Sequence, residues 1–389
     1  MPDSMSTFGR GQWPAAVIAN LLVIGILVYI GLLHESDFER YYATLQEDEA
    51  LEWATFWGFM GASVLYAKAA FRQRAAGVSV PWFLAGVSLF TFVIGMEEIS
   101  WAQRVFSYRP PEYFLENNFQ QEFNFHNIMS NDLRKTGLKL VVLSYGVVLP
   151  LLGITPPIRR LFDRVGIAAP TPLLIPAFGA TYALYEEYPW KYTGETVELM
   201  LATSFLFSAT WSAALHADPP PDNRRMELSL YRGLLGILLL GFATSELSHL
   251  RKGMDPLYAL TTQAETDALA RDFERIARRP GGRLASSCDV HKRVYSYTEK
   301  YGGRVLDNGK FAALVPGGLP EERAEFFLDP WNGPYWIRDR CADSDEERPR
   351  RTFVYSFGPN MKRDSSQTRL AGDDIGTYIY DTAPDDERR

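Results

Sequence analysis

Apolar residues are concentrated in the first 250 positions of the chain, where they form seven long runs separated by polar segments. A helix that spans a membrane needs about 20 mostly apolar residues, which is close to the length of each run. The runs occupy residues 13–33, 51–71, 81–99, 137–157, 170–188, 196–216 and 228–249. Proline and glycine within several runs are tolerated where helices pack together. The pattern therefore predicts an all-α membrane bundle of seven transmembrane helices over residues 1–250.

The remaining residues, 251–389, are polar and charged, so the mean hydropathy of −0.15 averages two unlike halves. Their first part, 258–278, has apolar residues at helical spacing and is followed by Pro280, Gly281 and Gly282. The pattern predicts a second domain, 251–389, that begins with an amphipathic helix. A net charge of −7 argues against a nucleic-acid partner, because phosphate binding needs clustered lysine and arginine.

Basic residues indicate how the helices would cross the membrane. They concentrate in the connections after the second, fourth and sixth runs: Lys68, Arg72, Arg74, Arg159, Arg160, Arg164, Arg224 and Arg225. The first connection is acidic instead. Because short cytoplasmic loops are rich in lysine and arginine, we expect a cytoplasmic amino terminus and a periplasmic carboxy-terminal domain. The first run lacks a clear cleavage site, so it is interpreted as a retained anchor in a bacterial inner membrane.

Three motifs near the carboxy terminus occur in a characteristic order: LDPWNGPYW (328–336), VYSFGPN (354–360) and AGDDIGTY (371–378). This region, 328–380, resembles the carboxy-terminal domain of the major pseudopilin of bacterial type II secretion systems. The resemblance implies a small α+β domain, in which a helix precedes a short antiparallel sheet. The amino-terminal half, through GMEEISW (95–101), resembles uncharacterised bacterial polytopic membrane proteins, which implies no activity.

The pseudopilin resemblance also implies a calcium site. The positions that match the family's ligands are the Phe357 carbonyl, Asn360, Asp373 and Asp374. Calcium takes 6–8 oxygen ligands, and carbonyl and carboxylate oxygens both suit it. Two departures are expected to weaken binding: the family usually has aspartate where Asn360 stands, and Met361–Leu370 is a longer, basic insertion. The alternative is a solvated acidic turn without a metal.

The prepilin cleavage arrangement of the family is missing before the last apolar run, in RRMELSLYRGLLGILLL (224–240). The domain is therefore expected to stay tethered to the membrane.

Both cysteines, Cys288 and Cys341, fall in the half that is expected outside the cytoplasm. Disulfides persist in that compartment, so a Cys288–Cys341 bond is predicted. The alternative is two free thiols in a cytoplasmic tail.

A second candidate site is a belt of polar residues at the outward ends of the runs. If the third run continued as a helix, Glu97, Ser100, Trp101 and Arg104 would share one face. Carboxylates at a membrane boundary need partners or water. The candidate pocket comprises Glu97, Glu98, Arg104, Glu122, His126, Glu186 and Glu187. Such a pocket could bind a second divalent metal, relay protons or bind a polar headgroup. The alternative is ordinary interfacial anchoring.

Two functions are compatible with this sequence. The first is non-enzymatic: a membrane protein whose tethered calcium-binding domain docks on a secretion or pilus-type envelope assembly, with the lipid bilayer and envelope proteins as partners. The second is a membrane-embedded enzyme, of a metal-dependent, lipid-directed hydrolase type, or a transporter. The pseudopilin resemblance and the expected orientation favour the first, and the Glu97, Glu98, Glu122 and His126 cluster motivates the second. The sequence contains no Walker loop, GxSxG, HExxH or CxxC motif.

Overall fold

The computed structural model describes residues 13–45, 49–75, 81–106, 108–118, 120–217, 221–252, 256–277, 290–296, 307–340, 351–361, 363–366 and 369–381. The chain forms two compact units. The first comprises Met1–Trp101 and Met129–Glu246, and the second comprises Ala102–Ile128 and Leu247–Arg389. The division predicted after residue 250 falls close to Leu247, but the segment 102–128, which lies between two apolar runs, belongs to the second unit.

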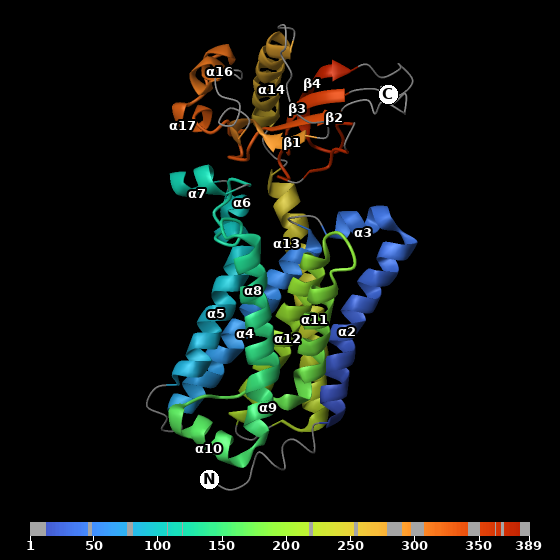
Figure 1. The fold of residues 1–389 in the computed structure, drawn as a ribbon, viewed down its shortest axis with the longest axis vertical. Coiled ribbons are helices and arrows are strands. Elements are labelled where there is room, and N and C mark those ends of the chain that lie inside the picture. The colour runs from blue at the N-terminus through green and yellow to red at the C-terminus, as the bar shows by residue number, and fades with distance from the viewer. Residues whose placement is uncertain are drawn as a thin grey trace. The chain divides into compact units, whose positions relative to one another are not determined.

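The first unit is a bundle of helices that lie side by side (Figure 1). Its long helices are α2 (Trp13–Ser36), α4 (Ala50–Ala75), α5 (Trp82–Glu98), α8 (Asn131–Leu143), α11 (Ile175–Glu187), α12 (Thr193–Leu215) and α13 (Asn223–Lys252). Shorter elements connect them: α3 (Phe38–Thr44), η2 (Ser144–Val148), α9 (Leu149–Ile154), α10 (Pro156–Val165) and η3 (Pro172–Leu174).

Four helical stretches are long and apolar enough to cross a membrane: Trp13–Ser36, Asp132–Ile154, Thr193–Leu215 and Asn223–Leu247. The other three predicted spans do not meet both criteria within the described residues. Helix α5 has 17 residues and α11 has 13, so both are short, while α4 has 26 residues but is not apolar enough, because alanine, glycine, tryptophan and tyrosine make up much of it. The helical bundle is confirmed, whereas the number seven stays a prediction.

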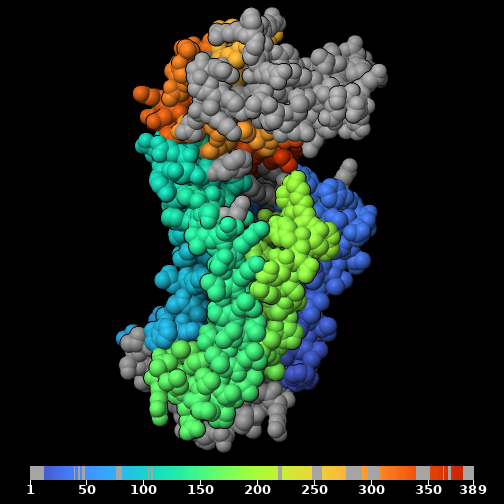
Figure 2. Space-filling view, viewed as in Figure 1, coloured from blue at the N-terminus to red at the C-terminus, as the bar shows by residue number. Residues whose placement is uncertain are grey.

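The surface of the first unit is unusually apolar. Large hydrophobic side chains are exposed along α2, α8, α9 and α13, among them Leu21, Leu32, Leu140, Leu151, Leu235 and Leu239. Figure 2 shows the face formed by α8 to α11. Contiguous apolar surface of this kind is unfavourable in water and marks membrane or protein contact. Together with the four apolar stretches, it indicates a membrane protein.

Helices α8 and α9 form one continuous helical stretch that is interrupted by a π-helical turn. Pro150 has no backbone N–H and its ring clashes with the preceding turn, and a π turn absorbs such a defect. The turn brings Gly146 against the ring of Phe178. A Cβ at Gly146 would lie 2.3 Å from the Phe178 Cγ, so only glycine fits.

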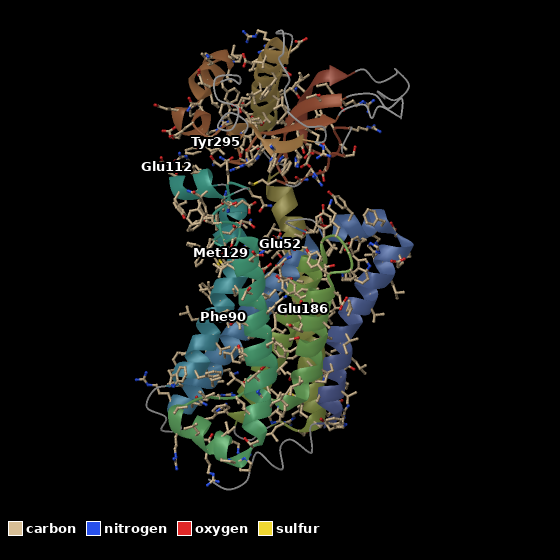
Figure 3. The ribbon with its side chains drawn as sticks, viewed as in Figure 1. Glu52, Phe90, Glu112, Met129, Glu186 and Tyr295 are labelled. Carbon is tan, nitrogen blue, oxygen red and sulfur yellow. The ribbon has the colours of Figure 1, made fainter. Side chains whose placement is uncertain are left out.

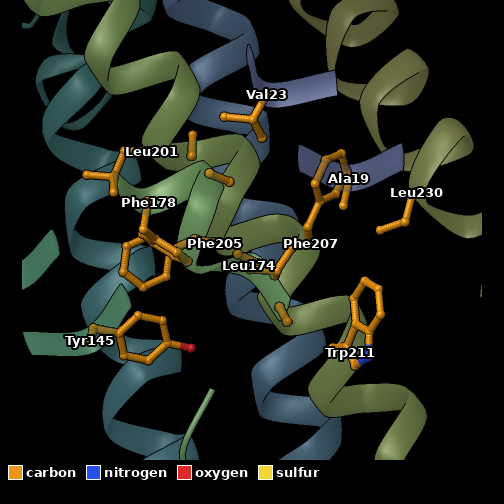
Figure 4. Close-up of a cluster of buried hydrophobic side chains, with 14 of the residues drawn as sticks. Ala19, Val23, Tyr145, Leu174, Phe178, Leu201, Phe205, Phe207, Trp211 and Leu230 are labelled. Carbon is orange, nitrogen blue, oxygen red and sulfur yellow. The ribbon is translucent and has the colours of Figure 1, made fainter. Parts of the chain in front are cut away.

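The core of the first unit is aromatic (Figure 4). Tyr145 stacks on Phe205 with ring centroids 4.8 Å apart, and Phe178 meets Phe205 edge-on at 5.7 Å. The Tyr145 hydroxyl is hydrogen-bonded to the Tyr66 hydroxyl and lies 3.0 Å from the Ser208 Oγ. Buried hydroxyl groups on three helices therefore satisfy one another, as polar groups in an apolar bundle must.

Helices α4 and α12 pack in parallel at close range. Gly58 lies against Ala202 and Gly61 lies against Leu206, so backbones approach where side chains are smallest. Nearer the carboxyl ends, the Arg72 Nη1 donates to the Ala213 carbonyl at 2.9 Å. The residue numbers of these contacts increase together along both helices, so α4 and α12 run in the same direction.

The second unit contains a four-stranded antiparallel sheet in the order β1-β2-β3-β4. The strands are β1 (Val290–Arg293), β2 (Trp336–Arg340), β3 (Arg351–Ser356) and β4 (Ile375–Asp381). Helix α14 (Pro256–Ala277) packs on one face (Figure 1), where its apolar residues form a core with the sheet: Ala268, Leu269, Phe273, Ile337, Val354 and Ile379. The amphipathic helix predicted over 258–278 and the short antiparallel sheet are both confirmed.

Among the described residues, the second unit also contains the short helices α6 (Gln103–Phe106), α7 (Glu112–Asn117), α16 (Asn308–Leu314) and α17 (Glu321–Ala324). Two of them, α6 and α7, belong to the segment 102–128. Leu115 of α7 is fully buried against Phe326 and Leu328. The Arg293 guanidinium of β1 donates to the Asn118 carbonyl at 2.7 Å. The segment is thus part of the core of the second unit.

Replacing Gly58 with leucine should destabilise the first unit, because a Cβ at this position would lie 2.9 Å from the Ala202 Cβ. Overpacking of this kind costs about 1–3 kcal/mol, which would lower the melting temperature in detergent by several degrees. The matched control is Gly86→Leu on α5, where a Cβ meets nothing within 4 Å. Equal melting temperatures for both variants would contradict the close α4–α12 contact.

Candidate functional site

The predicted calcium ligands lie in the connection between β3 and β4. Ser356, the last residue of β3, pairs with Ile375, the first of β4. This pairing brings the segment after Ser356 next to the segment before Ile375. Gly358 has a φ of 68°, and a Cβ there would lie 2.1 Å from the Asp373 carbonyl oxygen. Glycine is therefore required for the two segments to approach each other.

Asn360 and Asp373 are in direct contact. The Asn360 backbone N–H donates to the Asp373 Oδ2 at 3.2 Å, and its Nδ2 donates to the Asp373 Oδ1. The same Nδ2 donates to the Oδ2 of Asp364 at 2.9 Å. Asp364 was not among the predicted ligands. It is the only acidic residue in the Met361–Leu370 insertion. The insertion was expected to weaken the site through its basic residues, but it also brings a third carboxylate into the loop.

The carboxyl groups of Asp373 and Asp374 in this loop have raised pKa values. Burial, together with the hydrogen bond to Asp364 and the negative charge of Asp364, raises the pKa of Asp373 to about 7. Burial also raises the pKa of Asp374 to about 7, against the opposing effect of its hydrogen bonds with Ser365. One oxygen of Asp374, Oδ1, is buried and has no hydrogen-bond partner among the described residues. A cation beside these oxygens would favour their charged forms.

The donor set suits a hard cation, but the side chains would have to turn to bind one. As they stand, no three His, Cys, Asp or Glu side chains within the described ranges are arranged to hold a metal ion. Asn360 presents its amide nitrogen to two carboxylates. Rotation of that amide would present its oxygen instead, and amide nitrogen and oxygen are nearly equal in shape.

The LDPWNGPYW motif (328–336) is hydrogen-bonded to the end of β3, where this loop begins. Buried Asp329 accepts hydrogen bonds through its Oδ1 from the backbone N–H groups of Trp331, at 2.9 Å, and Gly333, at 2.8 Å. Its Oδ2 accepts from the Ser356 hydroxyl, and the Ser356 Oγ accepts from the Gly358 N–H at 2.9 Å. Burial raises the pKa of Asp329 to about 7. The motif thus holds the strand end from which the acidic loop departs.

A buried ion pair links the same motif to α14. Arg323 donates to the carboxylate of Glu265 at 2.6 Å, and the Tyr335 hydroxyl donates to the same oxygen. Arg323 also donates to the Asp329 carbonyl at 3.1 Å. Glu265 is fully buried, and burial raises its pKa. The sequence offered no signal for this pairing, because the partners are distant along the chain.

The polar belt of the first unit is distributed over different environments. Glu97 is buried and accepts a hydrogen bond from the Trp101 Nε1 at 2.6 Å. Glu186 on α11 (Figure 3) is exposed and forms an ion pair with Lys139 at 2.8 Å. Glu187 is exposed and Glu98 is half-buried. The convergence of these carboxylates into one pocket therefore stays a prediction.

The third run does not continue as one helix through Arg104, so the condition for Glu97, Ser100, Trp101 and Arg104 to share a helical face is not met. Helix α5 ends at Glu98, and Ser100, Trp101 and Ala102 have φ values of 47°, 53° and 65°. Three successive non-glycine residues in the left-handed region reverse the local helical sense. The contact between Glu97 and Trp101 forms nevertheless.

The remaining candidates, Arg104, Glu122 and His126, belong to the second unit. Glu122 is buried and accepts from the Asn124 Nδ2 at 2.9 Å, while its carbonyl accepts from the Asn118 Nδ2 at 2.7 Å. His126 is half-buried, and the Arg104 side chain lies outside the described residues. In ENNFQQEFNFHN, the buried amide and carboxylate groups thus hold the loop in its fold.

Cys288 and Cys341 both lie outside the described residues. The predicted disulfide between them is therefore not visible in this structure.

Comparisons with known proteins found no relative. No protein-family model, no curated protein and no solved structure matches the chain.

Proposed function

We propose that this chain is an integral membrane protein whose second unit is a tethered, pseudopilin-like, calcium-binding domain that docks on an envelope assembly. The observation that carries the proposal is the architecture of the second unit. A long helix packs on a short antiparallel sheet, and an acidic loop joins its last two strands. This is the plan that the resemblance of residues 328–380 implies.

The proposed topology has seven spans: α2, α4, α5, the α8–α9 stretch, α11, α12 and α13. Parallel packing of α4 and α12 supports it, because the second and sixth spans would cross in the same direction. The incorporation of 102–128 into the second unit also supports it, because four spans separate that segment from residue 247. An even number of crossings returns the chain to the same side. The basic connections favour the periplasm for that side.

The disulfide between Cys288 and Cys341 is part of this proposal. Val290 is paired with Asp339 across β1 and β2. Cys288 precedes Val290 by two residues, and Cys341 follows Asp339 by two. The bond would stabilise the domain by roughly 2–4 kcal/mol. Mass spectrometry of protein extracted without reductant should find the two cysteines linked, and two free thiols would contradict both the bond and the periplasmic location.

The proposed calcium ligands are the Phe357 carbonyl, Asn360, Asp373 and Asp374, to which the structure suggests adding Asp364. The cation would offset the repulsion between these carboxylates. Calcium tolerates the mixed oxygen set and the irregular loop, whereas magnesium demands a near-octahedral site at shorter distances. The whole chain is needed for the test, because residues 102–128 complete the core of the second unit.

Calcium at a hundredfold excess over its Kd should stabilise the folded protein by about 2.7 kcal/mol, and chelator should lower the melting temperature of its second unit by several degrees. Asp373→Ala should abolish the difference, while Glu321→Gln, which removes an exposed carboxylate on α17, should leave it intact. A melting temperature that calcium and chelator both leave unchanged would refute the site.

The calcium effect should also depend on pH. Since Asp373 and Asp374 have pKa values raised to about 7, the folded protein binds more protons than the unfolded chain between about pH 4 and 7. In chelator these groups therefore make folding less favourable as the pH rises through that range. Protons compete with calcium at pH 6 but not at pH 8, so the calcium-induced shift should be larger at pH 8.

Asn360→Asp should strengthen calcium binding, because it adds a carboxylate.

The proposed partner is a subunit of a secretion or pilus-type assembly. The second unit is joined to membrane helices on both sides of 102–128 and again before residue 247, so a docking role fits it better than extraction into a fibre. Co-purification from native membranes should recover a subunit of such an assembly, and Asp373→Ala should reduce the recovery. Normal secretion in a deletion strain, with no envelope subunit recovered, would remove the proposal.

A further inference from the structure

A shallow groove of the first unit lies along α4, near its carboxyl end. It has a volume of about 480 Å³, is open to the outside, and is lined by Val64, Ala67, Lys68, Phe71, Arg72 and Ala75. These residues recur at intervals of three and four, so they share one face of the helix. Val64 is 64% exposed and Phe71 is 73% exposed, so the part of the chain that the structure describes leaves this apolar face largely uncovered.

Two cations interrupt the apolar lining. Lys68 is exposed, and among the described residues no carboxylate is paired with it. Arg72 is half-buried and already held in place, since its Nη1 donates to the Ala213 carbonyl at 2.9 Å. A guanidinium group has five N–H donors, so most of its hydrogen-bonding capacity remains for a ligand. Such a held guanidinium beside an exposed ammonium favours phosphate recognition.

The dimensions of the groove match one leaflet of a bilayer. From Val64 to Ala75 the helix rises about 16 Å at 1.5 Å per residue, which is about half of the 30 Å hydrocarbon thickness. Val64 and Ala67 lie on the side of Lys68 toward the middle of α4, whereas Phe71, Arg72 and Ala75 lie toward the end that the topology assigns to the cytoplasm. The groove therefore combines apolar surface with two cations, of which Arg72 is one helical turn nearer that end than Lys68.

We propose that this groove binds one anionic phospholipid. Its phosphate contacts Lys68 and Arg72, and its acyl chain lies along Val64, Ala67 and Phe71. The long Lys68 side chain can lie along the apolar wall while its ammonium reaches the headgroup level. This proposal depends on the membrane location of the first unit, and it is independent of the calcium loop and of docking.

The test uses the full-length protein in detergent, with phosphatidylglycerol or phosphatidylcholine added. Phosphatidylglycerol should raise the melting temperature more than phosphatidylcholine does, and native mass spectrometry should detect one retained anionic lipid. Lys68→Gln should weaken the apparent affinity for phosphatidylglycerol about fivefold, the equivalent of about 1 kcal/mol for one cation near the headgroups. Without added lipid, Lys68→Gln should melt as the parent protein does, because Lys68 is exposed.

The matched control is Arg74→Gln. Arg74 is exposed on the same end of α4 but does not line the groove, so its loss should leave the affinity unchanged. Equal losses in the two variants would show a general surface charge effect and overturn the proposal.

A second arm distinguishes lipid from free phosphate. Phe71→Ala should weaken phosphatidylglycerol binding, and inorganic phosphate should give little stabilisation at the same concentration. If inorganic phosphate stabilises the protein equally and Phe71→Ala has no effect, the site binds the ion alone and the lipid proposal is wrong.

Discussion

The rest of the structure depends on the incorporation of residues 102–128 into the second unit. Leu115 fills a hydrophobic position beside Phe326 and Leu328, and the Arg293 guanidinium satisfies the Asn118 carbonyl. These contacts connect a loop between two bundle helices to a domain that begins more than a hundred residues later. The chain therefore passes between the two units at three places, after Trp101, after Ile128 and after Glu246.

Within the bundle, stability comes from close approach and from internal hydrogen bonds. Between helices in lipid, the hydrophobic effect contributes little, because lipid tails are as apolar as leucine. Glycines such as Gly58 and Gly146 let neighbouring elements approach closely, while the Tyr66–Tyr145–Ser208 hydroxyls form a buried network. These features hold the helices together, and they explain why polar residues occur inside runs that otherwise look uniformly apolar.

In the second unit, the buried carboxylate of Asp329 connects the LDPWNGPYW motif (328–336) with the VYSFGPN motif (354–360). Asp329 closes its own turn through Trp331 and Gly333, and it fixes Ser356, which in turn binds the Gly358 N–H. Desolvating this carboxylate is costly, as its raised pKa indicates. Hydrogen bonds from Trp331, Gly333 and Ser356 offset part of that cost. The acidic loop therefore starts from a strand end that is held by hydrogen bonds.

Hydrophobic periodicity alone predicted the helical bundle, the amphipathic helix of residues 258–278 and the change in character near residue 250, because each follows from local spacing. The motifs predicted that Asn360, Asp373 and Asp374 would lie in one loop, and the β3–β4 pairing brings them together. The sequence pattern did not predict that Asp364 belongs to the candidate calcium site. Asp364 lies in a basic insertion, and only the folded loop brings it beside Asp373. The sequence pattern also missed the left-handed turn at Ser100–Ala102 and the membership of 102–128 in the second unit. These features depend on contacts between residues far apart in the chain, and only tertiary packing determines them.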